Sequence, residues 1–392
     1  MNSSSLWPRL LCSSFIMFSA SAQPLITHKD VFTAGTEGYH TFRIPAIVTA
    51  MDGTLIAFAE GRRDNSHDPG NGDIDLVLKR STDNGATWSA LQVLDDPGEK
   101  WGASNPTPVV DRSNGRVLIL YNRWEPGIDT PQAQAGTMKN QTWMRSSDDS
   151  GRTWSAPRDI TRSARDYDNW SAMFLGPGGA IQTRSGRLLV PAAMSPDTYY
   201  LWASVGAFSG RIEIMRSFAL YSDDHGATWQ RGALLPALTN ECQLVEIADG
   251  AIMMDARQGG GDHRWIVVSQ NGGQTWSRPR AGQVVSPVAT AIERYTSKAA
   301  GDDRDRILWT GITGPGRKGL VLRVSYDEGQ TFTNEHLLYG GYAAYSELTI
   351  LKDKTVGVLW ERGVSDGYQH ITFTRVNRDF LEPRGTAVPV FR

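Results

Sequence analysis

A short motif, S-x-[DN]-x-G-x-T-[WF], recurs five times and constrains the fold of this chain more than any other feature. The copies are STDNGATW at 81–88, SDDSGRTW at 147–154, SDDHGATW at 222–229, SQNGGQTW at 269–276 and SYDEGQTF at 325–332. Each copy follows an apolar-rich stretch such as DLVLK or WIVV, which predicts a strand, a tight turn and a second strand. The Asp can accept hydrogen bonds from turn amides, the Gly supplies a positive φ, and the aromatic residue packs inward.

A second kind of hairpin alternates with this motif. Its copies are PAIVTAMDGTLIAFAEGR, PTPVVDRSNGRVLILYNR, GGAIQTRSGRLLVPAAM, CQLVEIADGAIMMDAR, VATAIERYTSKAAGDDRDRILWTG and SELTILKDKTVGVLWERG. Two hairpins make a four-stranded blade, so the pattern predicts an all-β fold, a six-bladed β-propeller of four-stranded antiparallel blades. The last blade lacks the S-x-D turn, and HITFTRV is predicted as its outer strand. A two-sheet sandwich, the alternative, does not predict this period.

The N-terminus resembles a targeting segment. Arg9 is followed by an apolar stretch at 10–18 and by the A-x-A pattern at 20–22. We therefore expect a secretory signal peptide at 1–22 and the propeller at 23–392, in a secreted or periplasmic protein. A buried N-terminal strand is the alternative. The chain has two cysteines, and the other one, Cys12, lies in the predicted signal peptide. Cys242 is therefore expected to have no disulfide partner and to be a buried structural thiol.

Charge and spacing exclude several function classes. The 40 basic and 42 acidic residues contain no basic block, so no nucleic-acid partner is expected. No other segment is a candidate for a membrane span, and a monomer is expected. No metal-ligand spacing, phosphate-binding loop or dinucleotide motif is present, so neither a metal nor a cofactor is predicted.

The segment YHTFRIPAIV at 39–48 places an arginine where an apolar strand begins. Pro45 disfavours the helical region for Ile44, so extended chain is expected there. Taken alone, Arg43 is most simply a solvated surface residue. In an up-and-down blade, however, both kinds of turn lie on one face, and strand 1 starts, strand 2 ends and the loops to strand 3 share the other. That face then collects Arg43, Arg62, Asp68, Asn105, Glu241, Arg257, Arg317, Tyr345 and Glu361.

Three guanidinium groups at one face indicate a site for an anionic ligand. The planar forks of Arg43, Arg257 and Arg317 match a carboxylate bidentately, and Glu361 is expected to hold Arg43 in place. A tyrosine and acidic residues beside them, without a metal or cofactor motif, favour hydrolytic chemistry.

Four features together resemble the bacterial exo-acting branch of the sialidase (neuraminidase) family: FRIP at 42–45, the five turns, NECQLVE at 240–246 and AYSEL at 344–348. The resemblance covers essentially all of residues 23–392. It implies a six-bladed propeller that binds the carboxylate of sialic acid through three arginines. The residues that match the family's motifs are Arg43, Arg257 and Arg317 as those arginines, Tyr345 as nucleophile, Glu241 as its base and Asp68 as acid/base. Some of these roles have alternative candidates. Glu246 could serve in place of Glu241 and Arg323 in place of Arg317. Asp64 or Asp73 could serve in place of Asp68.

The resemblance also implies a substrate and a reaction. Arg62 and Asn105 match positions on the O4 side of the sugar, where the family often has Asp in place of Asn105. Sialylated glycoproteins, glycolipids or oligosaccharides are the implied partners of an exo-α-sialidase that retains configuration through a tyrosyl-enzyme intermediate. A trans-sialidase, an intramolecular trans-sialidase and an inactive sialoglycan-binding propeller are the alternatives. Candidate stacking residues, or mere packing residues, are Trp124, Tyr199, Tyr200 and Trp202.

Overall fold

The computed structural model describes residues 23–198, 200–205, 208–258 and 261–382, with the backbone alone at 202–211 where that segment is described. The predicted signal peptide at 1–22, Tyr199 and the side chain of Trp202 lie outside this description. Within these described ranges, helices are confined to four short elements: η1 (Thr130–Gln132), α1 (Thr161–Ala164), η2 (Lys298–Ala300) and α2 (Arg378–Leu381). Strands make up the remaining regular structure, so the predicted all-β class is confirmed. No helix in the described part of the chain is long and apolar enough to cross a membrane.

The N-terminal half of the repeat forms one sheet with the order β2-β3-β4-β6-β7-β8-β9, in which β5 also pairs with β4. Its strands are β2 (Thr41–Thr49), β3 (Leu55–Arg62), β4 (Ile74–Ser81), β5 (Gln92–Asp95), β6 (Gly102–Asp111), β7 (Arg116–Trp124), β8 (Asn140–Ser147) and β9 (Arg158–Asp159). A single parallel pair, Ile74 with Gly102, joins β4 to β6. The sheet therefore consists of two antiparallel groups, β2 to β5 and β6 to β9.

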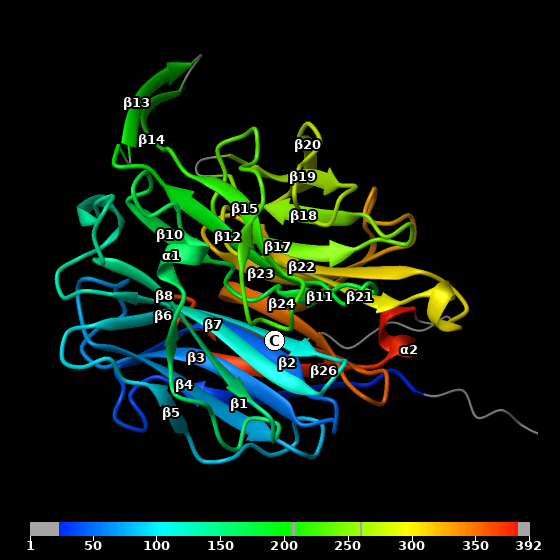
Figure 1. The fold of residues 1–392 in the computed structure, drawn as a ribbon. Helices are drawn as coiled ribbons and strands as arrows, with labels where there is room; N and C mark the ends of the chain where they lie inside the picture. The colour runs from blue at the N-terminus through cyan, green and yellow to red at the C-terminus, as the bar shows by residue number, and fades with distance from the viewer. Residues whose placement is uncertain (1–22, 199, 206–207, 259–260, 383–392) are drawn as a thin grey trace, which may run out of the picture.

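Two further antiparallel sheets follow along the chain, with the orders β10-β12-β15-β16 and β17-β18-β19-β20; β11 pairs with β12. Their strands are β10 (Ala172–Leu175), β11 (Ile181–Gln182), β12 (Leu188–Ser195), β15 (Arg216–Ser222), β16 (Gln230–Arg231), β17 (Cys242–Glu246), β18 (Ile252–Ala256), β19 (His263–Ser269) and β20 (Arg280–Val284). A separate hairpin of β13 (Tyr200–Val205) and β14 (Phe208–Glu213) projects from the molecule at the top of Figure 1. Cys242 is buried and free, as predicted.

The last sheet has the order β1-β26-β25-β24-β23-β22-β21. Its strands are β1 (Ile26–Thr33), β21 (Ala291–Thr296), β22 (Arg306–Gly314), β23 (Lys318–Ser325), β24 (Thr333–Ile350), β25 (Val356–Gly363) and β26 (His370–Val376). The segment HITFTRV is β26, but it is not the outer strand as predicted. Its free edge is covered by β1, with Ile26 opposite Val376. The strand after the predicted signal peptide thus completes the C-terminal group of strands.

The S-x-D turns are held by one hydrogen-bond pattern. In the first copy, the Ser81 hydroxyl donates to Asp83 at 2.8 Å and accepts from the Gly85 amide at 2.9 Å. Asp83 also accepts from the Thr87 amide at 2.9 Å and hydroxyl at 2.6 Å. These bonds from Thr87 lower the pKa of Asp83 to about 2. Gly85 has a φ of 86°, and a Cβ there would lie 2.1 Å from a ring carbon of Phe373.

The apolar cores lie between neighbouring groups of strands. One buried cluster joins Phe42 and Ile47 of β2 with Leu359 of β25 and Phe373 of β26. Burying each such side chain contributes about 1.5–3 kcal/mol. The first strands of the groups also contact one another in a closed order: β2 with β6, β6 with β11, β11 with β17, β17 with β21, β21 with β24, and β24 with β2. The starts of these strands are therefore held close together.

Candidate active site

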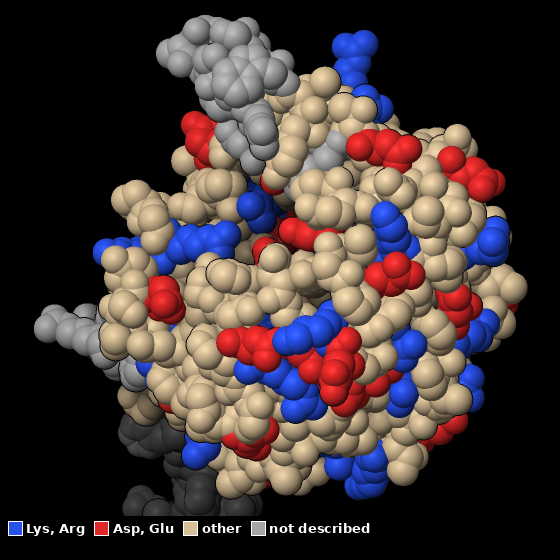
Figure 2. Space-filling view, turned by 90° about the vertical axis from the view of Figure 1, so that its left-hand side faces the viewer, with Lys and Arg blue, Asp and Glu red and all other residues tan. Residues whose placement is uncertain are grey.

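One pocket brings together residues that lie far apart in the sequence. Its volume is about 340 Å³, and Figure 2 shows this side of the molecule hollowed near its centre, with acidic and basic side chains visible inside. The predicted site residues that line the pocket are Arg62, Asp68, Asn105, Glu241, Arg257, Arg317 and Tyr345. Arg43 and Glu361 do not line it but contact Tyr345: Arg43 lies against its ring, and Glu361 accepts its backbone amide.

Bulges shape the strand starts at this pocket. The register of β2 against β3 shifts after Arg43, and Ile44 has a φ of 60°. A corresponding shift in β6 places Asn105 at a φ of 55°. The expected extended segment is present as β2, but Ile44 itself departs from extended geometry, and a positive φ is costly for a β-branched side chain. A bulge re-aims the side chains beside it. The bulge in β2 lies next to Arg43 and the bulge in β6 lies next to Asn105, and both residues are predicted to bind the ligand.

Glu361 of β25 holds three parts of the site at once. Its fully buried carboxylate accepts from Arg43 Nε at 2.8 Å and Nη2 at 3.4 Å. It also accepts the Ile44 amide, which the bulge frees from the ladder, at 2.8 Å, and the Tyr345 amide at 2.9 Å. The expected contact between Glu361 and Arg43 is therefore present. These bonds compensate the charge of the buried carboxylate and join β2 and β24 to β25.

Glu60 of β3 plays the same part for the bulge in β6 as Glu361 plays for the bulge in β2. The sequence analysis did not name Glu60 as a site residue. Its carboxylate accepts the bulge amide of Asn105 at 2.9 Å and bonds to Arg62 at 3.0 and 2.6 Å. Burial raises the pKa of Glu60, and the charge of Arg62 opposes that rise. The signal was present in the repeat, because Glu60 in FAEGR and Glu361 in LWERG are at equivalent positions of their hairpins.

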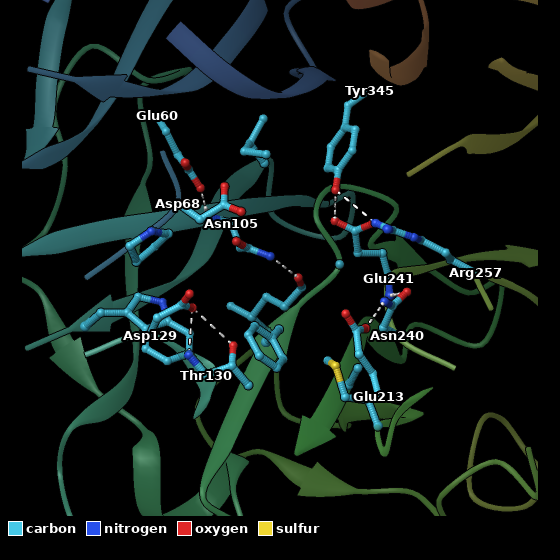
Figure 3. A pocket seen from close by; sticks show the side chains of 18 of the residues that line it. Glu60, Asp68, Asn105, Asp129, Thr130, Glu213, Asn240, Glu241, Arg257 and Tyr345 are labelled. Atoms are coloured by element: carbon cyan, nitrogen blue, oxygen red, sulfur yellow. Dashed lines mark hydrogen bonds and ion pairs between the residues drawn. The ribbon is translucent and has the colours of Figure 1, made fainter. Parts of the chain in front are cut away.

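A hydrogen-bonded group of three residues forms one wall of the pocket (Figure 3). The Tyr345 hydroxyl donates to one carboxylate oxygen of Glu241, and Arg257 Nη1 donates to the other. The same Nη1 lies 3.2 Å from the Tyr345 hydroxyl. Asn240 supports the group, because its side-chain oxygen accepts the Glu241 amide at 2.7 Å and its amide donates to Glu213 at 3.2 Å.

The protonation state of Tyr345 follows from its surroundings. Burial raises the pKa of the phenol, and the Glu241 carboxylate raises it further, while Arg257 and Arg43 oppose both effects. The phenol is thus neutral at neutral pH and has a carboxylate acceptor in place for its proton. This arrangement is what a hydroxyl nucleophile with an adjacent base requires.

Arg43 and Arg317 flank the ring of Tyr345, with guanidinium carbons 5.4 and 5.8 Å from its centroid. Arg317 lies just before β23 and donates to the hydroxyl of Tyr368 at 2.7 Å. The alternative, Arg323, is directed elsewhere: it pairs with Glu335 at 2.6 Å and does not line the pocket.

Asp68 lies across the pocket from Tyr345 (Figure 3). Arg62 is buried and donates to Asp68 at 2.9 Å, whereas the Asp68 side chain is 68% exposed. Partial desolvation acts to raise the pKa of Asp68, but the charges of Arg62 and Arg43 outweigh it and lower the pKa. The alternatives to Asp68 and Glu241 do not line this pocket. Asp64 pairs with Lys100, and Asp73 lies beside Arg63. Glu246, the alternative to Glu241, pairs with Arg184.

Other lining residues divide into polar and apolar groups. The Asn105 side-chain amide donates to the Leu175 carbonyl at 2.8 Å, which orients the Asn105 side chain at the pocket. Trp124 lines the pocket but is 2% exposed and packs on Phe174, which fits a packing role, whereas Tyr200 is 39% exposed. Lining residues that the sequence analysis did not name include Glu60, Asp129, Thr130, Phe174, Glu213, Met215 and Asn240. No cluster of His, Cys, Asp or Glu suited to a metal occurs among the described residues.

Comparisons with known proteins show which family the chain belongs to. The BNR repeat-like domain family matches residues 53–358. The chain is 30% identical to a sialidase of Micromonospora viridifaciens and 28% identical to one of Bacteroides fragilis, in each case over 88% of this chain. It spans only 54% and 63% of the length of those two relatives.

A solved structure of a Hadza microbial sialidase, Hz136, matches with a TM-score of 0.79 and 25% identity, over 90% of this chain and 68% of that one. The family match at residues 53–358 covers more than half of the chain. The chain belongs to the sialidase family of BNR-repeat proteins.

Proposed function

We propose that this protein is an exo-α-sialidase, a glycoside hydrolase that removes terminal sialic acids from glycoproteins, glycolipids or oligosaccharides. One observation carries the proposal: the Tyr345 hydroxyl is hydrogen-bonded to Glu241 and Arg257 in one pocket, and the guanidinium groups of Arg43 and Arg317 lie against the Tyr345 ring. Three guanidinium groups suit one ligand carboxylate, and a tyrosine with an adjacent base suits an attack beside that carboxylate.

The substrate explains why a tyrosine is preferable to a carboxylate as nucleophile. Sialic acid carries its carboxylate on the anomeric carbon itself. A second negative charge about 4 Å away costs about 4 kcal/mol at an effective dielectric constant of about 20. A neutral phenol avoids that repulsion, as in glycosidases with a tyrosine nucleophile.

The first step forms a covalent intermediate. Glu241 takes the proton of the Tyr345 hydroxyl while the phenol oxygen attacks the anomeric carbon. The bond from that carbon to the leaving oxygen breaks, and Asp68 supplies the proton that the leaving group needs. Arg43, Arg257 and Arg317 hold the carboxylate, which fixes the anomeric carbon against the phenol oxygen.

The second step returns the enzyme to its starting state. Asp68, now ionised, takes a proton from water, and the water oxygen attacks the anomeric carbon. The bond to Tyr345 breaks, and Glu241 returns its proton to the phenol oxygen. Two displacements at one carbon give retention of configuration.

The strand groups support the finer form of the fold. We infer that the strands form six blades. The first two are β2–β5 and β6–β9, the third is β10–β16 without the projecting hairpin, and the fourth is β17–β20. The fifth is β21–β23 with the first part of β24, and the sixth is the rest of β24 with β25, β26 and β1. The closed order of contacts among the first strands supports this arrangement around an axis. The proposal also includes export through a signal peptide at 1–22, with a monomer of residues 23–392 acting outside the cytoplasm or in the periplasm.

Product analysis tests the activity. The purified protein is incubated with a 4-methylumbelliferyl sialoside and with sialyllactose, and the released sugar is identified by mass spectrometry and NMR. Hydrolysis predicts free sialic acid that is released first as the α-anomer. An anhydro-sugar or a transferred sialic acid would instead indicate an intramolecular or intermolecular trans-sialidase. Binding without release would indicate an inactive glycan-binding protein.

A further inference from the structure

Tyr368 links two of the three arginines of the site, although it does not line the pocket. It lies in the loop between β25 and β26. Its hydroxyl accepts a hydrogen bond from Arg317 Nη1 at 2.7 Å, and its ring lies 4.0 Å from the guanidinium carbon of Arg43. Tyr368 is not among the site residues that the sequence analysis named.

The two arginines depend on Tyr368 to different degrees. Arg43 is also held by the buried carboxylate of Glu361 through Nε and Nη2. For Arg317, in contrast, the Tyr368 hydroxyl is the only hydrogen-bond acceptor of the guanidinium group among the described residues. Removing the hydroxyl therefore frees the side chain of Arg317 and leaves that of Arg43 in place.

The loop that carries Tyr368 is itself fixed. The Tyr368 amide donates to Asp366 at 2.8 Å, and the ring packs against the buried cluster around Trp360. The preceding residue, Gly367, approaches β24 so closely that a Cβ would lie 3.1 Å from that of Ala344. The absence of a side chain at Gly367 thus brings Tyr368 next to the segment that carries Tyr345.

We propose that Tyr368 is a positioning residue that sets Arg317 and Arg43 in register for one carboxylate before the ligand arrives. A flexible arginine loses conformational freedom when it binds, and a guanidinium group that is already held loses less. The inference rests on the proposed sialidase function, because it concerns how that site binds the sialic acid carboxylate. It assigns Tyr368 no contact with the reacting atoms.

The test is a double-mutant cycle with Tyr368→Phe, Arg317→Ala and the double variant. The ligand is the 2,3-unsaturated sialic acid analogue, measured by calorimetry against its methyl ester. Loss of one hydrogen bond to a charged group predicts that Tyr368→Phe weakens binding of the acid about tenfold. The ester should lose much less, because it lacks the charge that Arg317 meets. In the Arg317→Ala background, Tyr368→Phe should change nothing, because the group through which it acts is gone.

Kinetics and a matched control separate positioning from structure. Tyr368→Phe should raise KM for the aryl sialoside and leave kcat within about twofold, since the phenol nucleophile is untouched. Tyr326→Phe is the control, because the Tyr326 hydroxyl donates to Glu382 at 2.8 Å away from the pocket. It should leave KM and both affinities unchanged.

Two outcomes would overturn the inference. One is a wild-type enzyme that is active while Tyr368→Phe leaves acid binding and KM unchanged. The other is an equal loss in the wild-type and Arg317→Ala backgrounds, which would mean that Tyr368 does not act through Arg317. A wild-type protein that releases no sialic acid would instead overturn the proposed function. Circular dichroism and thermal melting confirm that the variants are folded.

Discussion

Arg317 and Arg323 are close in sequence, yet their side chains meet different surroundings. Arg317 lines the pocket beside Tyr345, whereas Arg323 pairs with Glu335 and stacks on Trp309 at 5.2 Å. We predict that Arg317→Ala weakens binding of a sialic acid analogue by about 2–4 kcal/mol, since up to two charge-assisted bonds are lost. Arg323→Ala should leave binding nearly intact, as measured by calorimetry. The reverse order of effects would place the anion site at the other side of β23.

Asp68 carries a pKa below the ordinary range for Asp, since the charges of Arg62 and Arg43 outweigh partial desolvation. The empty site therefore holds Asp68 ionised, although the leaving group needs its proton. A bound ligand carboxylate offsets the arginine charges and should raise this pKa.

The pH dependence follows with a definite sign. For sialyllactose, kcat/KM should fall as the pH rises from about 5 to about 8, because the protonated fraction of Asp68 falls. Asp68→Asn should remove most activity on sialyllactose and little on an aryl sialoside, whose leaving group needs no proton. Equal losses on both substrates would assign Asp68 a role other than proton donor.

At the scale of elements, the bulge at the start of β2 depends on a carboxylate from another strand. Glu361 accepts from Arg43, the Ile44 amide and the Tyr345 amide. Glu361→Gln keeps the shape but leaves the Arg43 charge buried without its partner, a loss of about 3–5 kcal/mol. Urea unfolding should show that loss, with binding of the sialic acid analogue weakened as well. A variant as stable as the wild type would show that Arg43 finds another partner.

The S-x-D turns offer a test of a single element with a control that the chain provides. The pKa of Asp83 is lowered to about 2, so its carboxylate stabilises the fold above its unfolded-state pKa. This contribution is lost as the pH falls through the folded-state pKa.

Asp83→Ala should lower the free energy of unfolding by about 1 kcal/mol, since the side chain is largely exposed and its turn bonds have a modest net value. Asp83→Asn should keep most of that stability, because Asn271 in the fourth copy accepts the Thr275 amide at 2.9 Å and also bonds to its hydroxyl. Urea unfolding at neutral and acidic pH should show the acid-dependent part lost in both variants. An Asn variant as unstable as the Ala variant would mean that the charge, and not the hydrogen bonds, holds the turn.

At the scale of the whole molecule, the repeat predicted most of what the structure contains. Hairpin periodicity is a local property, so the alternation of strands and the face shared by Arg62, Glu241 and Tyr345 followed from the sequence alone. The position of β1 beside β26 did not follow, because its pairing joins opposite ends of the chain and leaves no local signal.

The missed features of the site have the same physical origin. Ile44 takes a positive φ because the Glu361 carboxylate, from a distant strand, accepts its amide. Tyr368 reaches Arg43 and Arg317 through a loop whose path depends on the packing of Gly367 against β24. Such contacts depend on tertiary structure, whereas the motif residues were found from their places at the ends of predicted strands and from their match to the motifs of the sialidase family.

The central claim, that Tyr345 is the nucleophile of a sialidase, is tested most directly by trapping its intermediate. A 3-fluorosialosyl fluoride has a good leaving group, so the covalent species forms, and the fluorine at C3 slows its breakdown. Glu241→Gln should slow the labelling, because the base that accepts the phenol proton is gone, and Tyr345→Phe should prevent it. After proteolysis, peptide mapping by mass spectrometry should find the added sugar on Tyr345. An adduct on Asp68 or Glu241, with Tyr345 unmodified, would contradict the account and indicate a glycosidase with a carboxylate nucleophile.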